Sequence, residues 1–199
     1  KIMKNGHLQY RLFKSFYRCE AKKMCKDFKK YILANDKVLD LGCGSGIVAK
    51  QIEETFKSKV KGIEIIDMRI VDISLKIYNG KDLSFIPDNE FDVVLISYVL
   101  HHTEDPKNIL KQVKRIAKKY IIIYEDLNEG FLGKIYCYCH GRLYDLFFLR
   151  NSVPAKFFNE KEWKDEFKDL GLRIVYSKNK DYFLNPVKRK MFVLEKTGV

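Results

Sequence analysis

The sequence predicts an α/β fold, in which a mostly parallel sheet carries helices on both faces. Three observations support this prediction: apolar strand-like runs alternate with stretches of helical periodicity, a glycine-rich turn follows the run at 38–41, and the run at 91–96 is apolar almost throughout. A nearly continuous apolar run is typical of a parallel strand that is covered on both faces. The chain has 199 residues, enough for one sizeable core, so we expect a single domain over 1–199.

The composition is that of a soluble globular protein, and it gives limited information about partners. Lysine and arginine number 38 against 26 acidic residues, so the net charge is +12. The lysines are spread along the chain, so we interpret most of them as residues on solvent-exposed helix faces. The excess of positive charge would also allow the protein to bind RNA. No run is long enough to span a membrane. The cysteines show no disulfide framework, so we expect a reduced, cytoplasmic protein.

Residues 1–34 are predicted to form a helical lead-in to the first strand. Lysines occupy much of this segment, and its apolar residues recur at close to helical spacing, at Leu8, Leu12, Phe16, Met24, Phe28 and Ile32. Packing on an edge of the sheet would account for such a segment without any functional role.

A glycine-rich turn joins the first strand, at 38–41, to the first helix, at 45–56. Gly42, Gly44 and Gly46 allow the backbone to turn sharply and a ligand to approach closely, because glycine has no side chain. The helix start offers free backbone N–H groups to a polar or anionic ligand. The turn is therefore a candidate ligand site.

Dinucleotides and S-adenosylmethionine both bind at turns of this kind. The dinucleotide fingerprint requires a further glycine at the place where this chain has Ile47. The carboxylate of Asp40, at the end of the strand, would repel a pyrophosphate but could receive the amino group of a methionine moiety. The turn therefore favours S-adenosylmethionine, and a purely structural turn without a ligand is the alternative.

The stretch from Val38 to Gly46 resembles the first motif of class I S-adenosylmethionine-dependent methyltransferases, and the similarity extends from about Lys37 to the end of the chain. The resemblance implies a Rossmann-like, seven-stranded sheet whose last strand is antiparallel and lies between the fifth and the sixth. It implies S-adenosyl-L-methionine as the cofactor, with Asp40, Gly42 and Gly44 in its binding site. In this family a helical lead-in often packs over the cofactor or substrate pocket.

The second strand, at 60–64, ends in Glu64. A carboxylate at this place can accept hydrogen bonds from both hydroxyls of a ribose, so Glu64 is a candidate cofactor ligand, with a plain surface glutamate as the alternative. Only residues 65–73 separate it from a third strand at 74–78. A parallel crossover takes about ten to twelve residues or more, so we expect its helix to be missing or vestigial. The sequence resembles a bacterial branch of the methyltransferases with this shortened crossover.

Further cofactor contacts follow from the resemblance at the ends of the third and fourth strands. Many methyltransferases have an aspartate at the position of Asn79, where it receives the adenine amino group. The side-chain oxygen of Asn79 can still accept, and Gly80 offers a backbone N–H. Ser97 and Tyr98 follow the strand at 91–96 and would face the methionine part of the cofactor, since ligands of open parallel sheets bind beyond the carboxyl ends of the strands.

Two adjacent histidines, His101 and His102, are candidates for acid–base chemistry because imidazole titrates near neutral pH. Adjacent side chains are not expected to point the same way, so His102 is the catalytic candidate, with structural hydrogen bonding as the alternative. Glu125 and Asp126 follow a fifth strand at 120–124. Either could act as a base or hold a cationic substrate. Glu125 is the second catalytic candidate, whereas Asp126 could equally cap the following segment.

Residues 127–158 are predicted to form a helical, lid-like insertion after the fifth strand. The part from 130 to 158 is rich in aromatic and apolar residues, which could serve an apolar or planar substrate, dimer packing or a plain core. Cys137, Cys139 and His140 have a spacing that is poor for a tetrahedral metal site, so no metal is predicted.

The remaining residues predict one helix and a terminal hairpin. Asn159 is expected to cap the helix, with Glu162 completing a capping box and Gly171 ending the helix. The last two strands are predicted at 172–177 and 190–194.

These residues lead us to expect methyl transfer from S-adenosylmethionine to an unidentified small-molecule acceptor, by in-line SN2 attack on the sulfonium methyl group. A lipid-like, quinone-like or other aromatic acceptor would suit the aromatic insertion at 130–158.

Enzymes that methylate exocyclic amino groups of bases carry Asn or Asp, two prolines and an aromatic residue after the fourth strand, and residues 97–100 lack this motif. An RNA-directed methyltransferase is one alternative. A non-catalytic S-adenosylmethionine-binding protein is the other, suggested by Asn79 and the short crossover.

Overall fold

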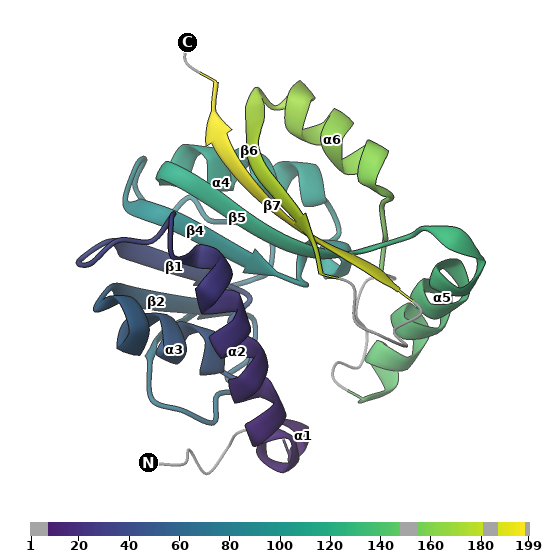
Figure 1. Ribbon diagram of the computed structural model, residues 1–199, viewed down its shortest axis with the longest axis horizontal. Coiled ribbons are helices and arrows are strands. Elements are labelled where there is room, and N and C mark those ends of the chain that lie inside the picture. The colour runs from purple at the N-terminus through teal and green to yellow at the C-terminus, as the bar shows by residue number, and fades with distance from the viewer. Residues whose placement is uncertain (1–7, 148–154, 181–186, 198–199) are drawn as a thin grey trace. The chain divides into compact units, whose positions relative to one another are not determined.

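The computed structural model describes residues 8–147, 155–180 and 187–197. Seven strands form one mixed sheet in the order β3-β2-β1-β4-β5-β7-β6, with helices on both sides (Figure 1). The strands are β1 (Lys37–Leu41), β2 (Lys59–Glu64), β3 (Ser74–Ile77), β4 (Phe91–Ser97), β5 (Ala117–Leu127), β6 (Leu172–Asn179) and β7 (Lys188–Lys196). The helices are α1 (Leu8–Leu12), α2 (Lys14–Phe28), α3 (Ile47–Phe56), the short 3₁₀ helix η1 (Leu100–His102), α4 (Pro106–Ile116), α5 (Gly130–Phe147) and α6 (Glu160–Asp169). This arrangement confirms the predicted fold class, including the antiparallel last strand.

The chain divides into two compact units. The first comprises Lys1–Leu95 with Ile116–Lys118, and the second comprises Ile96–Arg115 with Lys119–Val199. The first unit contains the glycine-rich turn, and the second contains both predicted catalytic residues.

In the first unit, β1 pairs with β2 and β2 pairs with β3, in both cases in parallel. Helix α3 packs against β2, and the lead-in helix α2 packs against α3. A cluster of buried residues, Ala21, Ile47 and Ile70, joins α2, α3 and the segment after β2. The lead-in is therefore tied to the helix that begins at the glycine-rich turn.

The segment between β2 and β3 contains no helix, as predicted: residues 65–73 are all described, and they form bends and loops. Two contacts fix its path. The N–H of Ile70 donates to the carbonyl of Ser45 over 3.0 Å, and Nη1 of Arg69 donates to the carbonyl of Ile73 over 2.5 Å. Ile70 and Ile73 are buried, so the short crossover contributes apolar side chains of its own to the core.

In the second unit, strand β5 extends beyond the predicted range at both ends. Its antiparallel pairing with β7 continues to Leu127, opposite Lys188. Glu125 and Asp126 therefore lie inside the strand, and the expectation that they follow its end is corrected. Helix α5 forms the first part of the predicted insertion, and residues 148–154 of that insertion lie outside the described residues.

Helix α6 begins with the predicted capping box. Oδ1 of Asn159 accepts from the N–H of Glu162 over 2.9 Å, and Oε2 of Glu162 accepts from the N–H of Asn159 over 2.7 Å. Gly171, with φ of 61°, follows the helix end in the left-handed conformation. Trp163 and Phe167, on the inner face of the helix, are fully buried.

Replacing Asn159 by alanine should lower the free energy of unfolding by about 1 kcal/mol, because the N–H of Glu162 loses its acceptor at the helix start. Urea denaturation followed by circular dichroism measures this change. Lys161→Ala, at an exposed position of the same helix, is the matched control and should change the stability by less than about 0.5 kcal/mol. Equal effects of the two variants would contradict a stabilising role for the cap.

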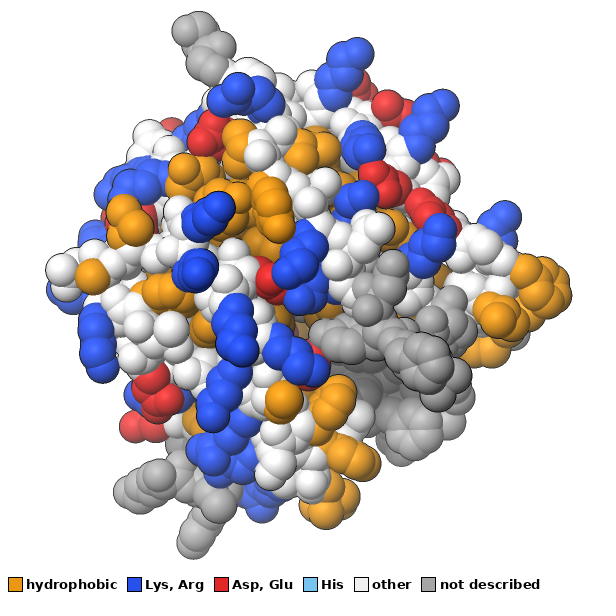
Figure 2. All heavy atoms as spheres, in the orientation of Figure 1, with side chains coloured by type: hydrophobic (Ala, Val, Ile, Leu, Met, Phe, Trp, Pro, Cys, Tyr) orange, Lys and Arg blue, Asp and Glu red, His pale blue; other side chains and the backbone are white. Residues whose placement is uncertain are grey.

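Among the described residues, no helix is both long enough and apolar enough to cross a bilayer. Figure 2 shows lysine and arginine side chains over many parts of the face that it draws, interspersed with hydrophobic and acidic ones. Some cations of the second unit have partners inside the protein. Nζ of Lys114 donates to the carbonyl of Leu170 over 2.8 Å, and Nζ of Lys188 lies 3.2 Å from Oε2 of Glu129.

Candidate cofactor site and histidine cluster

The glycine-rich turn of the first unit depends on the backbone freedom of glycine. Gly42, Gly44 and Gly46 have φ of 76°, 46° and 76°, in the left-handed region that other residues rarely adopt. The N–H of Gly42 donates to the carbonyl of Ile63 over 2.8 Å, which ties the turn to β2. A Cβ on Gly44 would lie 3.0 Å from the hydroxyl of Tyr10, so the lead-in helix α1 reaches the turn.

Asp40 lies at the end of β1 in front of this turn, and its side chain is unusual in two ways. Its exposed fraction is 2%, and its Oδ2 has no hydrogen-bond partner in the described part of the chain. Burial, and secondly the charge of Glu64, raise the pKa of Asp40 to about 7. A buried carboxylate oxygen without a donor is costly, so this position would favour a cationic ligand group such as an ammonium.

Glu64 lies at the end of β2 and contacts the same turn. Its Oε2 accepts from the N–H of Gly44 over 2.9 Å, and its Oε1 accepts from the N–H of Ile65 over 2.8 Å. Burial raises the pKa of Glu64. Each carboxylate oxygen can accept a second hydrogen bond, so the predicted contact to ribose hydroxyls remains compatible with these bonds.

Asn79 and Gly80 follow β3 in a tight turn. Oδ1 of Asn79 accepts from the N–H groups of Lys81 and Asp82 over 2.9 and 2.8 Å, which is an Asx turn. The oxygen that was expected to receive the adenine amino group therefore stabilises the local turn. The adenine contact of Asn79 stays a prediction, and Gly80, with φ of 80°, needs its glycine for the turn.

In the second unit, Ser97 and Tyr98 lie where β4 ends. Oγ of Ser97 is buried and has no hydrogen-bond partner among the described residues. Tyr98 has φ of 56°, a left-handed conformation that is rare for a residue with a large side chain. Its N–H donates to the carbonyl of Tyr124 over 2.8 Å, which holds the strained residue in place.

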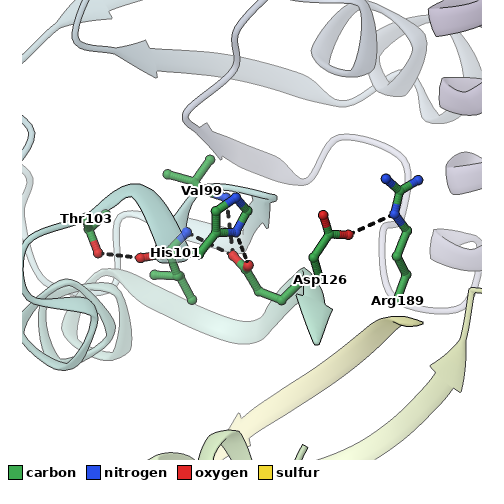
Figure 3. A network of polar contacts seen from close by, with 7 residues as sticks. Val99, His101, Thr103, Asp126 and Arg189 are labelled. Carbon is green, nitrogen blue, oxygen red and sulfur yellow. Dashed lines mark hydrogen bonds and ion pairs between the residues drawn. The ribbon is translucent and has the colours of Figure 1, made fainter. Parts of the chain in front are cut away.

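A half-buried ion pair of the second unit was not predicted from the sequence. Nε of Arg189, on β7, donates to Oδ1 of Asp126 over 2.8 Å (Figure 3), and the guanidinium carbon lies 5.2 Å from the centre of the Tyr98 ring. Asp126 is thus an ion-pair partner of Arg189, a role that its place inside β5 allows.

Glu125, also on β5, accepts several hydrogen bonds from one short stretch of chain. Its exposed fraction is 0%. Oε1 accepts from the N–H groups of Val99 and Leu100 over 3.2 and 2.9 Å, and Oε2 lies 2.5 Å from Nδ1 of His101 (Figure 3). The carboxylate therefore fixes both the backbone that enters η1 and the orientation of the His101 ring.

Three histidines of the second unit lie together. The ring centres of His101 and His102, on η1, are 4.1 Å apart, although adjacent side chains were expected to diverge. His140, on α5, lies 5.8 Å from the His101 ring and 5.5 Å from the His102 ring. Sequence reasoning missed this cluster because it considered His140 only with Cys137 and Cys139.

The surroundings of these histidines keep two of them uncharged. Burial, and then the neighbouring charges of His101 and His140, lower the pKa of His102 to about 2. Burial also lowers the pKa of His140. Both rings are neutral at neutral pH and keep a nitrogen lone pair. A pKa this low makes His102 a weak proton acceptor, so its predicted role as a general base loses support.

Comparison with known proteins gives one consistent family. A family model described as "Methyltransferase domain" matches residues 10–177. An uncharacterized protein of Methanocaldococcus jannaschii is 33% identical over 142 residues, which are 68% of this chain and 63% of that protein. A ubiquinone biosynthesis O-methyltransferase of Neisseria meningitidis is 28% identical over 111 residues, which are 49% of this chain and 47% of that enzyme. The chain thus spans less than two thirds of the length of these relatives.

The fold is similar to that of solved structures as well. A crystal structure of a SAM-dependent methyltransferase from Methanosarcina mazei superposes with a TM-score of 0.67 at 22% sequence identity. The similarity covers 85% of this chain and 96% of that one.

Proposed function

The chain belongs to the family of class I S-adenosylmethionine-dependent methyltransferases, and from this premise we propose that it transfers a methyl group from S-adenosyl-L-methionine to a small-molecule acceptor. The observation that carries the proposal is Asp40, whose buried Oδ2 has no donor among the described residues and lies at the end of β1 before the glycine-rich turn. The ammonium group of the cofactor's methionine part would supply that donor and neutralise the charge.

The residues of the first unit fit the rest of this cofactor. Glu64 keeps acceptor capacity for ribose hydroxyls, and the turn from Gly42 to Gly46 is shaped by left-handed glycines. Tyr10 lies against the turn at Gly44 and would limit the access of water from the lead-in side. When bound, the cofactor supplies an electrophilic methyl carbon on its sulfonium. The protein has to hold the acceptor atom in line with that carbon and exclude water.

The two predicted catalytic residues, Glu125 and His102, have different roles in this proposal. Glu125 is fully buried and already bonded to Val99, Leu100 and His101, so we assign it a positioning role, with no contact to the acceptor. His102 is half-buried and would contact an acceptor without taking its proton. Methyl transfer in this protein would then depend mainly on the proximity and orientation of the reactants.

Calorimetry with S-adenosylhomocysteine tests the cofactor site without turnover. The full chain should bind one molecule, and Gly44→Val should abolish binding, because a side chain there would disturb a turn that the ligand must approach closely. Gly130→Val is the matched control, since Gly130 has a similar φ of 69° but open space around it. No binding by the wild-type chain at millimolar ligand would overturn the proposal.

The acceptor class needs a second experiment. Cofactor with a labelled methyl group is incubated with the protein and cell extract, and the label is then measured in RNA, lipid and small-molecule fractions. Label in the small-molecule or lipid fraction is expected, in line with the small-molecule O-methyltransferase among the relatives. Label confined to RNA would contradict it.

An RNA acceptor is the second candidate, because the net charge is +12. Two lysines of the second unit, Lys114 and Lys188, already have partners in the protein, so their charges contribute less to an RNA-binding surface. We also propose a reducing, cytoplasmic location, in which the five cysteines would remain the free thiols that they are in the structure.

A further inference from the structure

Three histidine side chains of the second unit come together from two separate elements. His101 and His102 lie on η1 and His140 lies on α5, and one ring nitrogen of each lies within 4.8 Å of the corresponding nitrogens of the other two. Three histidine side chains in one place are a common set of protein ligands for transition-metal ions. Side-chain packing alone could also bring the three rings together. The groups around the histidines therefore decide between a metal site and simple packing.

Glu125 provides the independent second observation. Its Oε2 lies 2.5 Å from Nδ1 of His101, and its Oε1 is held by the N–H groups of Val99 and Leu100. A carboxylate that accepts from one ring nitrogen fixes the tautomer of the histidine, so that the other nitrogen, Nε2, carries the lone pair. This carboxylate–histidine arrangement is the one that orients histidine ligands of metal ions.

We infer that His101, His102 and His140 bind one divalent transition-metal ion, with Zn²⁺ as the natural choice for three imidazole nitrogens. A tetrahedral ion with Zn–N distances of about 2.0–2.1 Å places its nitrogens roughly 3.4 Å apart. The nitrogens lie within 4.8 Å of one another, so the rings of His102 and His140 would have to move closer to His101 when an ion binds. Three protein ligands would leave a fourth position for water or an oxygen ligand, as in catalytic rather than structural zinc sites.

The other groups around the cluster are compatible with an ion. The ring of Phe157 stacks on His101 at 4.5 Å, and that of Tyr136 stacks on His140 at 5.5 Å, so apolar faces flank the rings. The N–H of Lys156 donates to the backbone carbonyl of His101 over 2.7 Å, a contact that does not involve the ring of His101. Arg189, whose charge acts on His140, forms an ion pair with Asp126.

The test uses the full chain without an affinity tag, stripped with a chelator and titrated with CoCl₂ and then ZnCl₂. We expect one Co²⁺ per chain, with the visible absorption of a tetrahedral nitrogen site, and its displacement by Zn²⁺. His140→Ala should weaken binding by at least about 10–100-fold, the range that loss of even an indirect partner of a metal ligand causes. Cys139→Ser, next to His140 and exposed, is the matched control and should bind like the wild type.

Glu125→Gln tests whether the Glu125 carboxylate orients His101 for a metal ion or whether the three histidines only pack together. The amide would donate to Nδ1 of His101, so the ring proton would move to Nε2 and remove the lone pair. A loss of affinity of about 10–100-fold is expected.

Histidine NMR provides a measurement that does not depend on how any variant folds: Zn²⁺ should shift the ring signals of three of the four histidines in the wild-type chain. No bound ion, unchanged histidine signals, or binding lost in Cys139→Ser but kept in His140→Ala would overturn the inference. None of these measurements requires the methyl cofactor, so the metal site and the proposed function can fail independently.

Discussion

Replacing Asp40 by asparagine should weaken the binding of S-adenosylmethionine by about 10–100-fold and should also stabilise the cofactor-free protein. A hydrogen bond to a charged group contributes about 1.5–3 kcal/mol, and an amide retains only a weaker, neutral contact to an ammonium. In the absence of the cofactor, the buried Oδ2 has no donor among the described residues, so the neutral side chain removes an uncompensated charge.

The pH dependence of the two effects identifies Asp40 as their cause. Its pKa of about 7 in the folded protein lies well above the value of about 3.9 in an unfolded chain. Between these two values the folded state holds more protons, so the free energy of unfolding decreases as the pH rises. The wild type should therefore lose stability from about pH 4 to pH 7, and Asp40→Asn should lose less over this range, since only the raised pKa of Glu64 remains. Cofactor affinity should rise over about pH 6–8 in the wild type only.

Thermal unfolding and calorimetry at several pH values measure both effects. Asp88→Asn, which removes an exposed carboxylate of the same unit, is the matched control and should leave both quantities close to those of the wild type. Parallel pH profiles for the wild type and Asp40→Asn would contradict the assignment of the raised pKa to Asp40.

Removing Glu125 should cause the largest loss of stability in the second unit. Glu125→Ala leaves the N–H groups of Val99 and Leu100 and the ring of His101 without their acceptor. Breaking a buried charged network in this way costs about 3–5 kcal/mol of unfolding free energy. Glu125→Gln retains an oxygen for both N–H groups and should cost about 1 kcal/mol.

Urea denaturation of the two variants provides the measurement. Glu129→Ala removes a carboxylate four residues away that contacts the exposed Lys188 and accepts from the N–H of Glu160 over 3.0 Å. It should cost about 1–2 kcal/mol, less than Glu125→Ala. If alanine and glutamine at position 125 were equally destabilising, the volume of the side chain and not its hydrogen bonds would be responsible.

The features that were predicted correctly depend on residues close together in the sequence. The glycine-rich turn before α3 and the capping box of Asn159 are local patterns, and the missing helix after β2 follows from the length of the crossover alone. The order of the strands came from the resemblance to a family and not from the pattern of residues.

The features that were missed depend on pairs far apart in the sequence. The extra length of β5 at its C-terminal end depends on pairing with β7, and the ion pair of Asp126 joins it to Arg189, 63 residues later. The cluster of His140 with His101 and His102 requires α5 to lie against η1. No periodicity or spacing reports such contacts, because they are determined by how the second unit packs.

The short crossover also affects how the chain folds. Lys61 pairs with Ser74, 13 residues later, whereas Lys37 pairs with Lys59, 22 residues later. Closing the shorter loop costs about 0.5 kcal/mol less conformational entropy. Parallel strands usually form slowly because their partners are distant, and this chain brings one pair unusually close together. Strands β2 and β3 are therefore the parallel pair favoured to form first, and substitutions at Leu75 should slow refolding more than substitutions at Leu39 do.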